Sequence, residues 1–111
     1  MKLLPSLRQK KRYIVFEIIA DEKFSFAEVK EEIDKVMKEF WGQLGLGKAS
    51  PLILKERFNA DKQMFMVKVN NKHVDELKAA LTLSKSIKSI PVIIKSIITS
   101  GTVKKASKYL S

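Results

Sequence analysis

The sequence predicts an α+β fold in which two helices cover one face of a four-stranded antiparallel sheet. Its hydrophobic patterns follow the order strand, helix, strand, strand, helix, strand, which is the split βαβ arrangement of ferredoxin-like domains. A length of 111 residues and a hydrophobic content of 45% suit one domain with a small core, so we expect residues 1–111 to form a single domain. A short basic helix is expected to follow the last strand.

The first strand is predicted over residues 11–20, KRYIVFEIIA, which are rich in aromatic and β-branched side chains. Successive side chains of a strand point to opposite faces of its sheet. Ile14, Phe16 and Ile18 are therefore expected to face the core. The opposite face is expected to carry Tyr13, Val15, Glu17 and Ile19.

The first helix is predicted to begin after Ser25, which forms a capping-box pattern with Glu28. Glycines at positions 42, 45 and 47 are expected to end it. Between these limits the apolar residues recur at helical spacing: Val29, Ile33, Val36, Met37, Phe40 and Leu44.

A hairpin is predicted for residues 51–58, PLILKERF, and 63–69, QMFMVKV, because only the polar segment NADK separates them. Asn70 or Asn71 is expected to cap the second helix. The apolar positions of that helix are Val74, Leu77, Ala80 and Leu81.

The last strand is predicted over residues 90–99, IPVIIKSIIT, after a polar break at 85–89. It is apolar on both faces, so both faces are expected to be covered. The segment Ser100-Gly101-Thr102 is expected to end the strand, and VKKASKYL to form the short basic helix.

Charge is the most informative part of the composition. Lys and Arg number 22 against 12 Asp and Glu, a net charge of +10 that favours a nucleic acid or an anionic membrane as partner. Residues 1–16 and 77–111 contain no acid, whereas 17–39 contain eight acids and four bases. A thermophile's enrichment in Lys and Glu is an alternative origin of the charge, but it does not explain two acid-free ends.

Other compositional features narrow the function classes. No cysteine is present, which excludes disulfides and thiolate metal sites. No apolar run approaches the roughly 20 residues of a membrane span, and we see no signal peptide, so we expect a cytoplasmic protein without a membrane partner.

Candidate catalytic and metal sites are weak. His73 is the single histidine, and it lies near the start of the second predicted helix, where an ordinary structural role is common. Acids close in sequence point apart on a helix rather than converging on an ion, and GQLGLGK lacks the spacing of a phosphate loop. The neighbouring acids in question are Asp21, Glu31, Glu32 and Asp34. We therefore expect no catalytic residue, no metal ligand and no bound cofactor in this chain.

A base-reading sheet is also not favoured. Sheets that read RNA stack bases on aromatic side chains of their central strands, whereas the outward positions of the third strand here carry Met64, Met66 and Lys68. Tyr13 is the one aromatic on the first strand that could stack. We expect Tyr13, Met64 and Met66 to contact protein instead.

The two basic ends are the strongest site candidate. In a split βαβ fold the first and last strands are antiparallel neighbours, so the start of one lies beside the end of the other. We therefore predict one cationic surface that binds RNA backbone. Its predicted members are Arg8, Lys10, Lys11, Arg12, Lys95, Ser100, Gly101, Thr102, Lys104, Lys105 and Lys108.

The segment Ser100-Gly101-Thr102 allows two interpretations. It could present the free N–H groups of a helix N-terminus to a phosphate. Alternatively, it is only a strand-to-helix turn in which Ser100 or Thr102 caps the helix.

Three separated segments, LPSLRQKKRYIVFEI, LKAALTLSKSI and SGTVKKA, resemble a known family. It is the small basic protein subunit of archaeal and eukaryotic ribonuclease P, called ribonuclease P protein component 2 in archaea. The resemblance covers nearly the whole chain in order. One segment departs from it: FMVKVNNKH stands where the family usually has a more basic, Arg-containing stretch, so RNA contact is not carried over to that segment.

The resemblance implies an RNA-recognition-motif-like α/β sandwich that binds the catalytic domain of ribonuclease P RNA. It also implies a larger TIM-barrel protein subunit as partner, and contact between copies of the small subunit within a heterotetramer. The implied holoenzyme removes the 5′ leader from precursor tRNA with Mg²⁺ held by the RNA. This chain would be an accessory subunit that is not catalytic alone.

Two other functions fit the same residues. One is a ferredoxin-like protein-interaction module whose basic ends are incidental, and the other is a generic RNA-binding or ribosomal protein.

Overall fold

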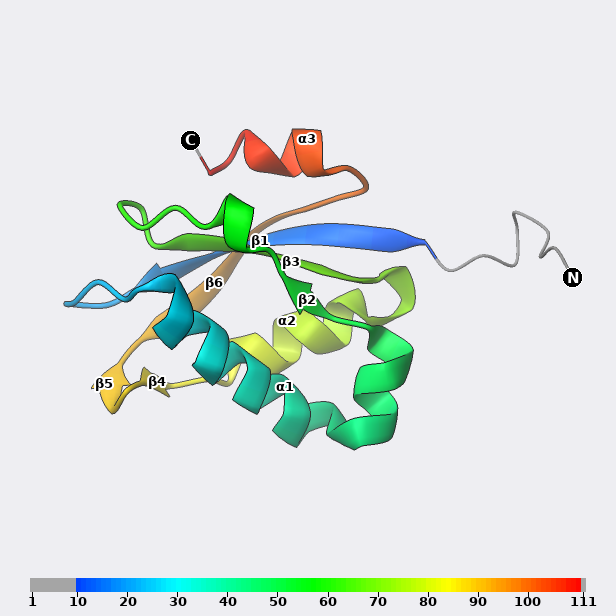
Figure 1. Cartoon of the computed structure of the whole chain (residues 1–111), viewed down its shortest axis with the longest axis horizontal. Helices are drawn as coiled ribbons and strands as arrows, with labels where there is room; N and C mark the ends of the chain where they lie inside the picture. The colour runs from blue at the N-terminus through cyan, green and yellow to red at the C-terminus, as the bar shows by residue number, and fades with distance from the viewer. Residues whose placement is uncertain (1–9, 111) are drawn as a thin grey trace, which may run out of the picture.

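The computed structural model describes residues 10–110, which form a four-stranded antiparallel sheet between two unequal layers of helix. Helices α1 (Phe26–Ala49) and α2 (Val74–Thr82) cover one face, and α3 (Val103–Ser107) lies over the other (Figure 1). Within the described range, no helix combines the length and the apolar character needed to cross a membrane.

The sheet has the ferredoxin-like strand order β2-β3-β1-β6, with every neighbouring pair antiparallel. This confirms the predicted α+β fold class. The four strands are β1 (Lys11–Ile19), β2 (Leu52–Ile53), β3 (Met64–Asn70) and β6 (Ile93–Ser100).

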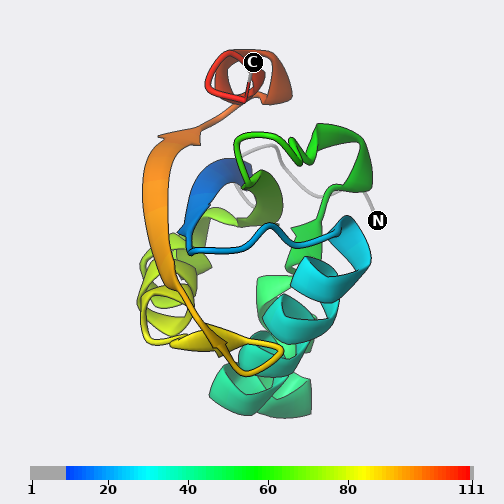
Figure 2. The same ribbon diagram turned by 90° about the vertical axis from the view of Figure 1, so that its left-hand side faces the viewer.

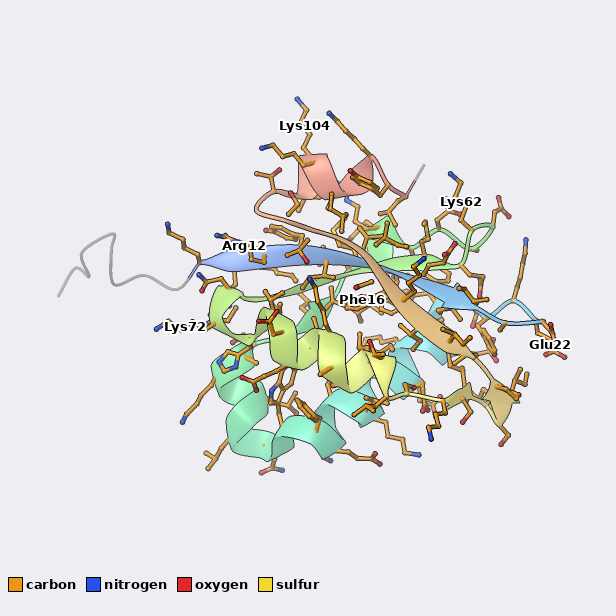
Figure 3. All side chains as sticks on the ribbon, turned by 180° about the vertical axis from the view of Figure 1, so that it is seen from behind. Arg12, Phe16, Glu22, Lys62, Lys72 and Lys104 are labelled. Atoms are coloured by element: carbon orange, nitrogen blue, oxygen red, sulfur yellow. The ribbon has the colours of Figure 1, made fainter. Side chains whose placement is uncertain are left out.

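The main core lies between the sheet and helices α1 and α2, as expected from the alternation in β1. Phe16 is fully buried and stacks on Phe65 of β3 with ring centroids 5.3 Å apart. Helix α1 contributes Ile33 and helix α2 contributes Leu77 to the same cluster. Figure 3 shows Phe16 near the middle of the sheet.

Helix α1 begins as predicted and continues further than predicted. Ser25 and Glu28 form the capping box, since each side chain accepts a hydrogen bond from the other's backbone N–H. Gly42 takes a positive φ of 69° and kinks the helix, but the helix then resumes to Ala49. The first helical run therefore ends at Gly42, as expected. Gly45 and Gly47 instead lie within a second run, where burial of Leu46 and Ala49 against the core outweighs the low helix propensity of glycine.

The kink brings the end of α1 against the start of α2. Trp41 Nε1 donates a hydrogen bond of 2.7 Å to Glu76 Oε2, and His73 Nδ1 lies 3.2 Å from Glu76 Oε1. Gly45 is required for this arrangement, because a Cβ there would lie 2.7 Å from the Cβ of Trp41. The hydrogen bond from Trp41, followed in weight by that from His73, lowers the pKa of Glu76 below its ordinary value of 4.5.

The predicted strand 51–58 is wrong in its second half. After β2, Leu54 still donates its N–H to Met66 of β3 over 2.9 Å, and the chain then turns into a short 3₁₀ helix, η2 (Lys55–Arg57). Phe58 returns toward the core and contacts the edge of Phe26. The break leaves β2 as a two-residue edge strand.

The predicted polar break and last strand contain an additional hairpin. Strands β4 (Ser86–Ile87) and β5 (Ile90–Pro91) pair across Lys88 and Ser89, both with positive φ. Lys88 Nζ lies 2.9 Å from Glu31 Oε2 of α1, which raises the pKa of Lys88. Strand β6 then begins at Ile93 rather than at residue 90.

Asn70 caps a 3₁₀ helix that precedes α2, not α2 itself as predicted, since the residue before α2 is His73 and its side chain forms no cap. Asn70 Oδ1 accepts a 3.0 Å hydrogen bond from the N–H of Lys72. This cap opens the 3₁₀ helix η3 (Asn71–His73), which leads directly into α2.

The second face of the sheet is only partly covered, which corrects the expectation for the last strand. Ala106 and Leu110 pack over Val15 and Met66 and bury this part of the face. Beyond α3, Ile93 stays 64% exposed. A short helix of about seven ångströms cannot shield a strand of eight residues.

We expect Phe16→Ala to lower the free energy of unfolding by about 3–5 kcal/mol, because it leaves a cavity beneath the stacked Phe65 ring. Phe40→Ala is the matched control, since Phe40 is 45% exposed and its removal should cost about 1 kcal/mol or less. Urea denaturation measures both. Equal losses in the two variants would contradict this placement of the core.

The Trp41–Glu76 contact predicts a pH-dependent stability. A carboxylate with a lowered pKa in the folded state stabilises the fold above its unfolded pKa, and loses that contribution as the pH falls through its folded pKa. Glu76→Gln should therefore melt at a lower temperature than the wild type at pH 7, with the difference closing below about pH 4.

The matched control is Asp75→Asn, which removes the same charge from the first turn of α2 without touching Trp41. Thermal melts from pH 7 to pH 3 compare the two variants. A Glu76→Gln difference that stays constant across this range would show that the carboxylate charge does not contribute.

Candidate nucleic-acid interface

The start of β1 lies beside the end of β6, as the strand order predicts. Tyr13 pairs with Ser100 across the two strands. A Cβ built on Gly101 would lie 3.7 Å from Nη1 of Arg12, so the guanidinium rests against the turn that leads into α3. The two acid-free ends therefore meet in the described part of the chain.

We call this surface the basic end. Arg12 lies where β1 begins, and Lys104 projects from α3 away from the sheet (Figure 3). The predicted residues that the structure brings together here are Lys10, Lys11, Arg12, Ser100, Gly101, Thr102, Lys104 and Lys105.

Two further lysines belong to the basic end and were not predicted. Lys68 pairs with Tyr13 across β1 and β3, so it lies in one row with Tyr13 and Ser100. Lys72 lies at the same end of the molecule as Arg12 (Figure 3), because the neighbouring Asn71 donates its N–H to Lys10 O over 2.8 Å. Sequence reasoning could have found both lysines by aligning the first and third strands as an antiparallel pair, residue by residue.

The other predicted members of this surface are Lys95, Lys108 and Arg8. Lys95 pairs with Glu17 and lies five residues before Ser100, roughly 16 Å along the strand, so its place in one continuous patch is wrong. Lys108 follows α3 and lines one hollow with Ser100, Gly101 and Lys105, so it borders the basic end. Arg8 lies outside the described residues.

The turn into α3 matches the cap interpretation. Ser100 Oγ accepts the N–H of Thr102 over 3.2 Å, and Thr102 Oγ1 accepts the N–H of Lys105 over 3.3 Å. Helix α3 has only five residues, so its dipole is small. These two N–H groups are already bonded within the turn, so they are not free to hold a phosphate.

The acidic side chains that form ion pairs lie on α1 and α2. Among residues 10–110, ion pairs join Lys30 to Asp34, Lys88 to Glu31 and His73 to Glu76, all on or beside α1 and α2. Glu28, on the same helix, has its pKa lowered by the hydrogen bonds of its cap with Ser25. Lysines of the basic end are thus left without carboxylate partners in the described range.

The three predicted protein-contact residues differ in accessibility. Met66 is fully buried beneath Ala106 and Leu110, so its expected role on an open surface is wrong: the chain's own α3 occupies that position. Tyr13 and Met64 are half-buried at the margins of the same cluster. They keep some surface for contact.

His73 has a structural environment. It contacts Glu76 through Nδ1 and packs edge-on against Trp41 with ring centroids 6.2 Å apart. Among residues 10–110, no three His, Cys, Asp or Glu side chains converge as a metal site would need.

Comparison with known proteins identifies the family. The model of the Rpp14/Pop5 family matches residues 12–111. The chain belongs to the Rpp14/Pop5 family.

Curated relatives support this family assignment over nearly the whole chain. A protein of Thermococcus gammatolerans is 39% identical over 96% of this chain and 87% of its own length. One of Pyrococcus furiosus is 37% identical over 98% and 90%, and one of Methanocaldococcus jannaschii is 38% identical over 97% and 78%. Each of the three is named ribonuclease P protein component 2. The resemblance noted in the sequence is confirmed.

A solved structure shares the fold of this Rpp14/Pop5 chain. A chain of the cryo-EM structure of yeast ribonuclease MRP superposes with a TM-score of 0.65 over 93% of this chain and 87% of that chain. Their sequences are 13% identical, so this likeness concerns the fold alone.

The cap at Thr102 predicts a local effect of mutation. Thr102→Val removes the oxygen that accepts the Lys105 N–H, at a cost of about 1 kcal/mol to α3, whereas Thr102→Ser keeps it. Amide hydrogen exchange of Lys105 and Ala106 measures the opening of α3. We expect exchange about five times faster in Thr102→Val; unchanged protection would contradict the cap.

Proposed function

We propose that this protein is a subunit of the ribonuclease P ribonucleoprotein and that its basic end binds the catalytic domain of ribonuclease P RNA. The observation that carries the proposal is the near full-length likeness to three proteins named ribonuclease P protein component 2. The clustering of lysines and Arg12 at one end of the sheet supports the RNA-binding part.

The proposed mechanism is electrostatic. Lys11, Arg12, Lys104 and Lys105 neutralise phosphates and release condensed counterions, which favours a compact RNA with little readout of sequence. The compact RNA retains the Mg²⁺ ions that perform the cleavage of the 5′ leader from precursor tRNA. This chain contributes no catalytic group in that scheme.

The proposed partners follow from the same role. They are the ribonuclease P RNA, a larger TIM-barrel protein subunit, a second copy of this chain within a heterotetramer, and precursor tRNA through the holoenzyme, in the cytoplasm. Partly open apolar side chains next to the basic end, Tyr13 and Met64, are available to a protein partner.

RNA binding should depend steeply on salt. Replacing Lys11, Arg12, Lys104 and Lys105 together by Ala should reduce the slope of log affinity against log salt by about 3 to 4, since each lost phosphate contact removes close to one. Filter binding to ribonuclease P RNA between low and moderate salt measures this slope.

The matched control removes the same number of charges from the side of α1 and α2: Lys35, Lys38, Lys48 and Lys85 to Ala. All four are exposed and lie outside the basic end. We expect the control to keep most of the wild-type slope. Equal loss in the two variants would show that net charge, and not this surface, binds the RNA.

Reconstitution separates the proposal from its alternatives. Adding the wild-type chain with its TIM-barrel partner to ribonuclease P RNA should lower the Mg²⁺ concentration needed for precursor tRNA cleavage. A generic RNA-binding protein would bind this RNA without that shift, and a protein-interaction module would bind little RNA at any salt. The four-fold variant of the basic end should require more Mg²⁺ than its matched control.

A further inference from the structure

The end of β6 and helix α3 enclose a hollow at the edge of the sheet. In the view of Figure 2, α3 lies above the upper end of β6, which is an edge strand. The hollow measures about 450 Å³. Its wall on the strand side is formed by 98–101, and its wall on the helix side by Lys105, Lys108 and Tyr109.

Tyr109 lies on a part of the helical segment that does not pack on the sheet. Ala106 and Leu110 are buried against the sheet, whereas Tyr109 is 45% exposed. Its backbone is nevertheless fixed, because its N–H donates to Ala106 O over 3.1 Å and the N–H of Leu110 donates to Ser107 O over 3.1 Å. Tyr109 therefore has an exposed side chain on a backbone that hydrogen bonds fix in place.

Positive charge and an apolar wall surround the ring. Lys105 on α3 and Tyr109 in the turn after it both line the hollow. Lys108 also borders the hollow, and Ile98 closes it on the strand side. The buried Oγ1 of Thr99, another lining residue, has no hydrogen-bond partner among residues 10–110.

This combination matches the chemistry of a single nucleotide. Base-stacking sites pair an aromatic face with cations that hold the adjoining phosphate. A base within a duplex is covered on both faces by its neighbours, so only an unpaired base can stack on a side chain. Ser100, Gly101 and Lys105 of the basic end line the hollow, so the hollow is continuous with that surface.

We infer that this hollow binds an unpaired RNA nucleotide, with its base stacked on Tyr109 and its phosphate held by Lys105 and Lys108. The inference rests on the proposed RNA-binding function and extends it, because the basic end alone explains only contact with backbone. It predicts that the protein distinguishes a single-stranded or bulged segment from a continuous helix.

The test compares two RNA probes with the full-length chain. One is a single-stranded oligouridine of about ten nucleotides and the other a blunt duplex of similar length. We expect Tyr109→Ala to weaken oligouridine binding about 5- to 100-fold and to leave duplex binding unchanged. Tyr109→Phe and Tyr109→Trp should keep the single-strand affinity because they keep an aromatic face.

Phe40→Ala is the matched control, since the Phe40 ring has the same 45% exposure but lies on α1. It should change neither affinity. Unchanged duplex binding also shows that α3 stays docked in Tyr109→Ala. Equal oligouridine affinity of Tyr109→Ala and wild type, or equal loss for both probes, would overturn the inference while the RNA-binding surface stands.

A second measurement does not depend on a variant. Ultraviolet irradiation of the wild-type complex with an oligouridine that carries 5-iodouridine should give a cross-link to Tyr109, located by mass spectrometry. Cross-links confined to other residues would overturn the inference. If the wild type binds neither probe nor ribonuclease P RNA, the proposed function itself fails, an outcome distinct from the failure of the Tyr109 contact alone.

Discussion

The placement of the sheet between its two helical layers depends on β1. This inner strand pairs with β3 on one side and β6 on the other, and it is buried on both faces. Phe16 packs beneath the helical layer and Val15 beneath α3. Because side chains alternate along a strand, these two neighbours decide which residues of β3 and β6 face each layer. The bulge in β6 opposite Val15 and Phe16 then re-aims the end of that strand toward Gly101 and α3.

A strand that is apolar on both faces does not define its own register, since a slip by one residue would still bury apolar side chains. Its polar flanks supply the missing constraint. Lys11 and Arg12 at one end cannot enter the core, and Glu17 near the other end lies opposite Lys95. The charged residues at the start of β1 therefore serve the fold as well as the basic end, because they hold this end of the strand at the rim of the sheet.

The predictions from sequence were correct where they depended on residues close together in the chain. The alternation in β1 and the capping box of Ser25 and Glu28 each depend on residues close together, and each is observed. They failed where burial by distant residues decides. The helical continuation beyond Gly42 requires the core that receives Ala49, which no local rule contains.

The same distinction applies to the candidate site. The order of the strands is enough to predict that the two basic ends meet. Which residues belong to the basic end depends on the residue-by-residue pairing of the strands. Lys68 joins because it pairs with Tyr13, and Lys95 is excluded because the strand carries it too far along. The sequence predicted only that Tyr109 belongs to a short basic helix. The structure shows that Leu110 faces the sheet and that Tyr109 is left exposed. By covering Val15 and Met66, α3 occupies part of the face on which sheets that read RNA stack bases, so the proposed RNA contacts lie at the basic end and in the hollow beside α3.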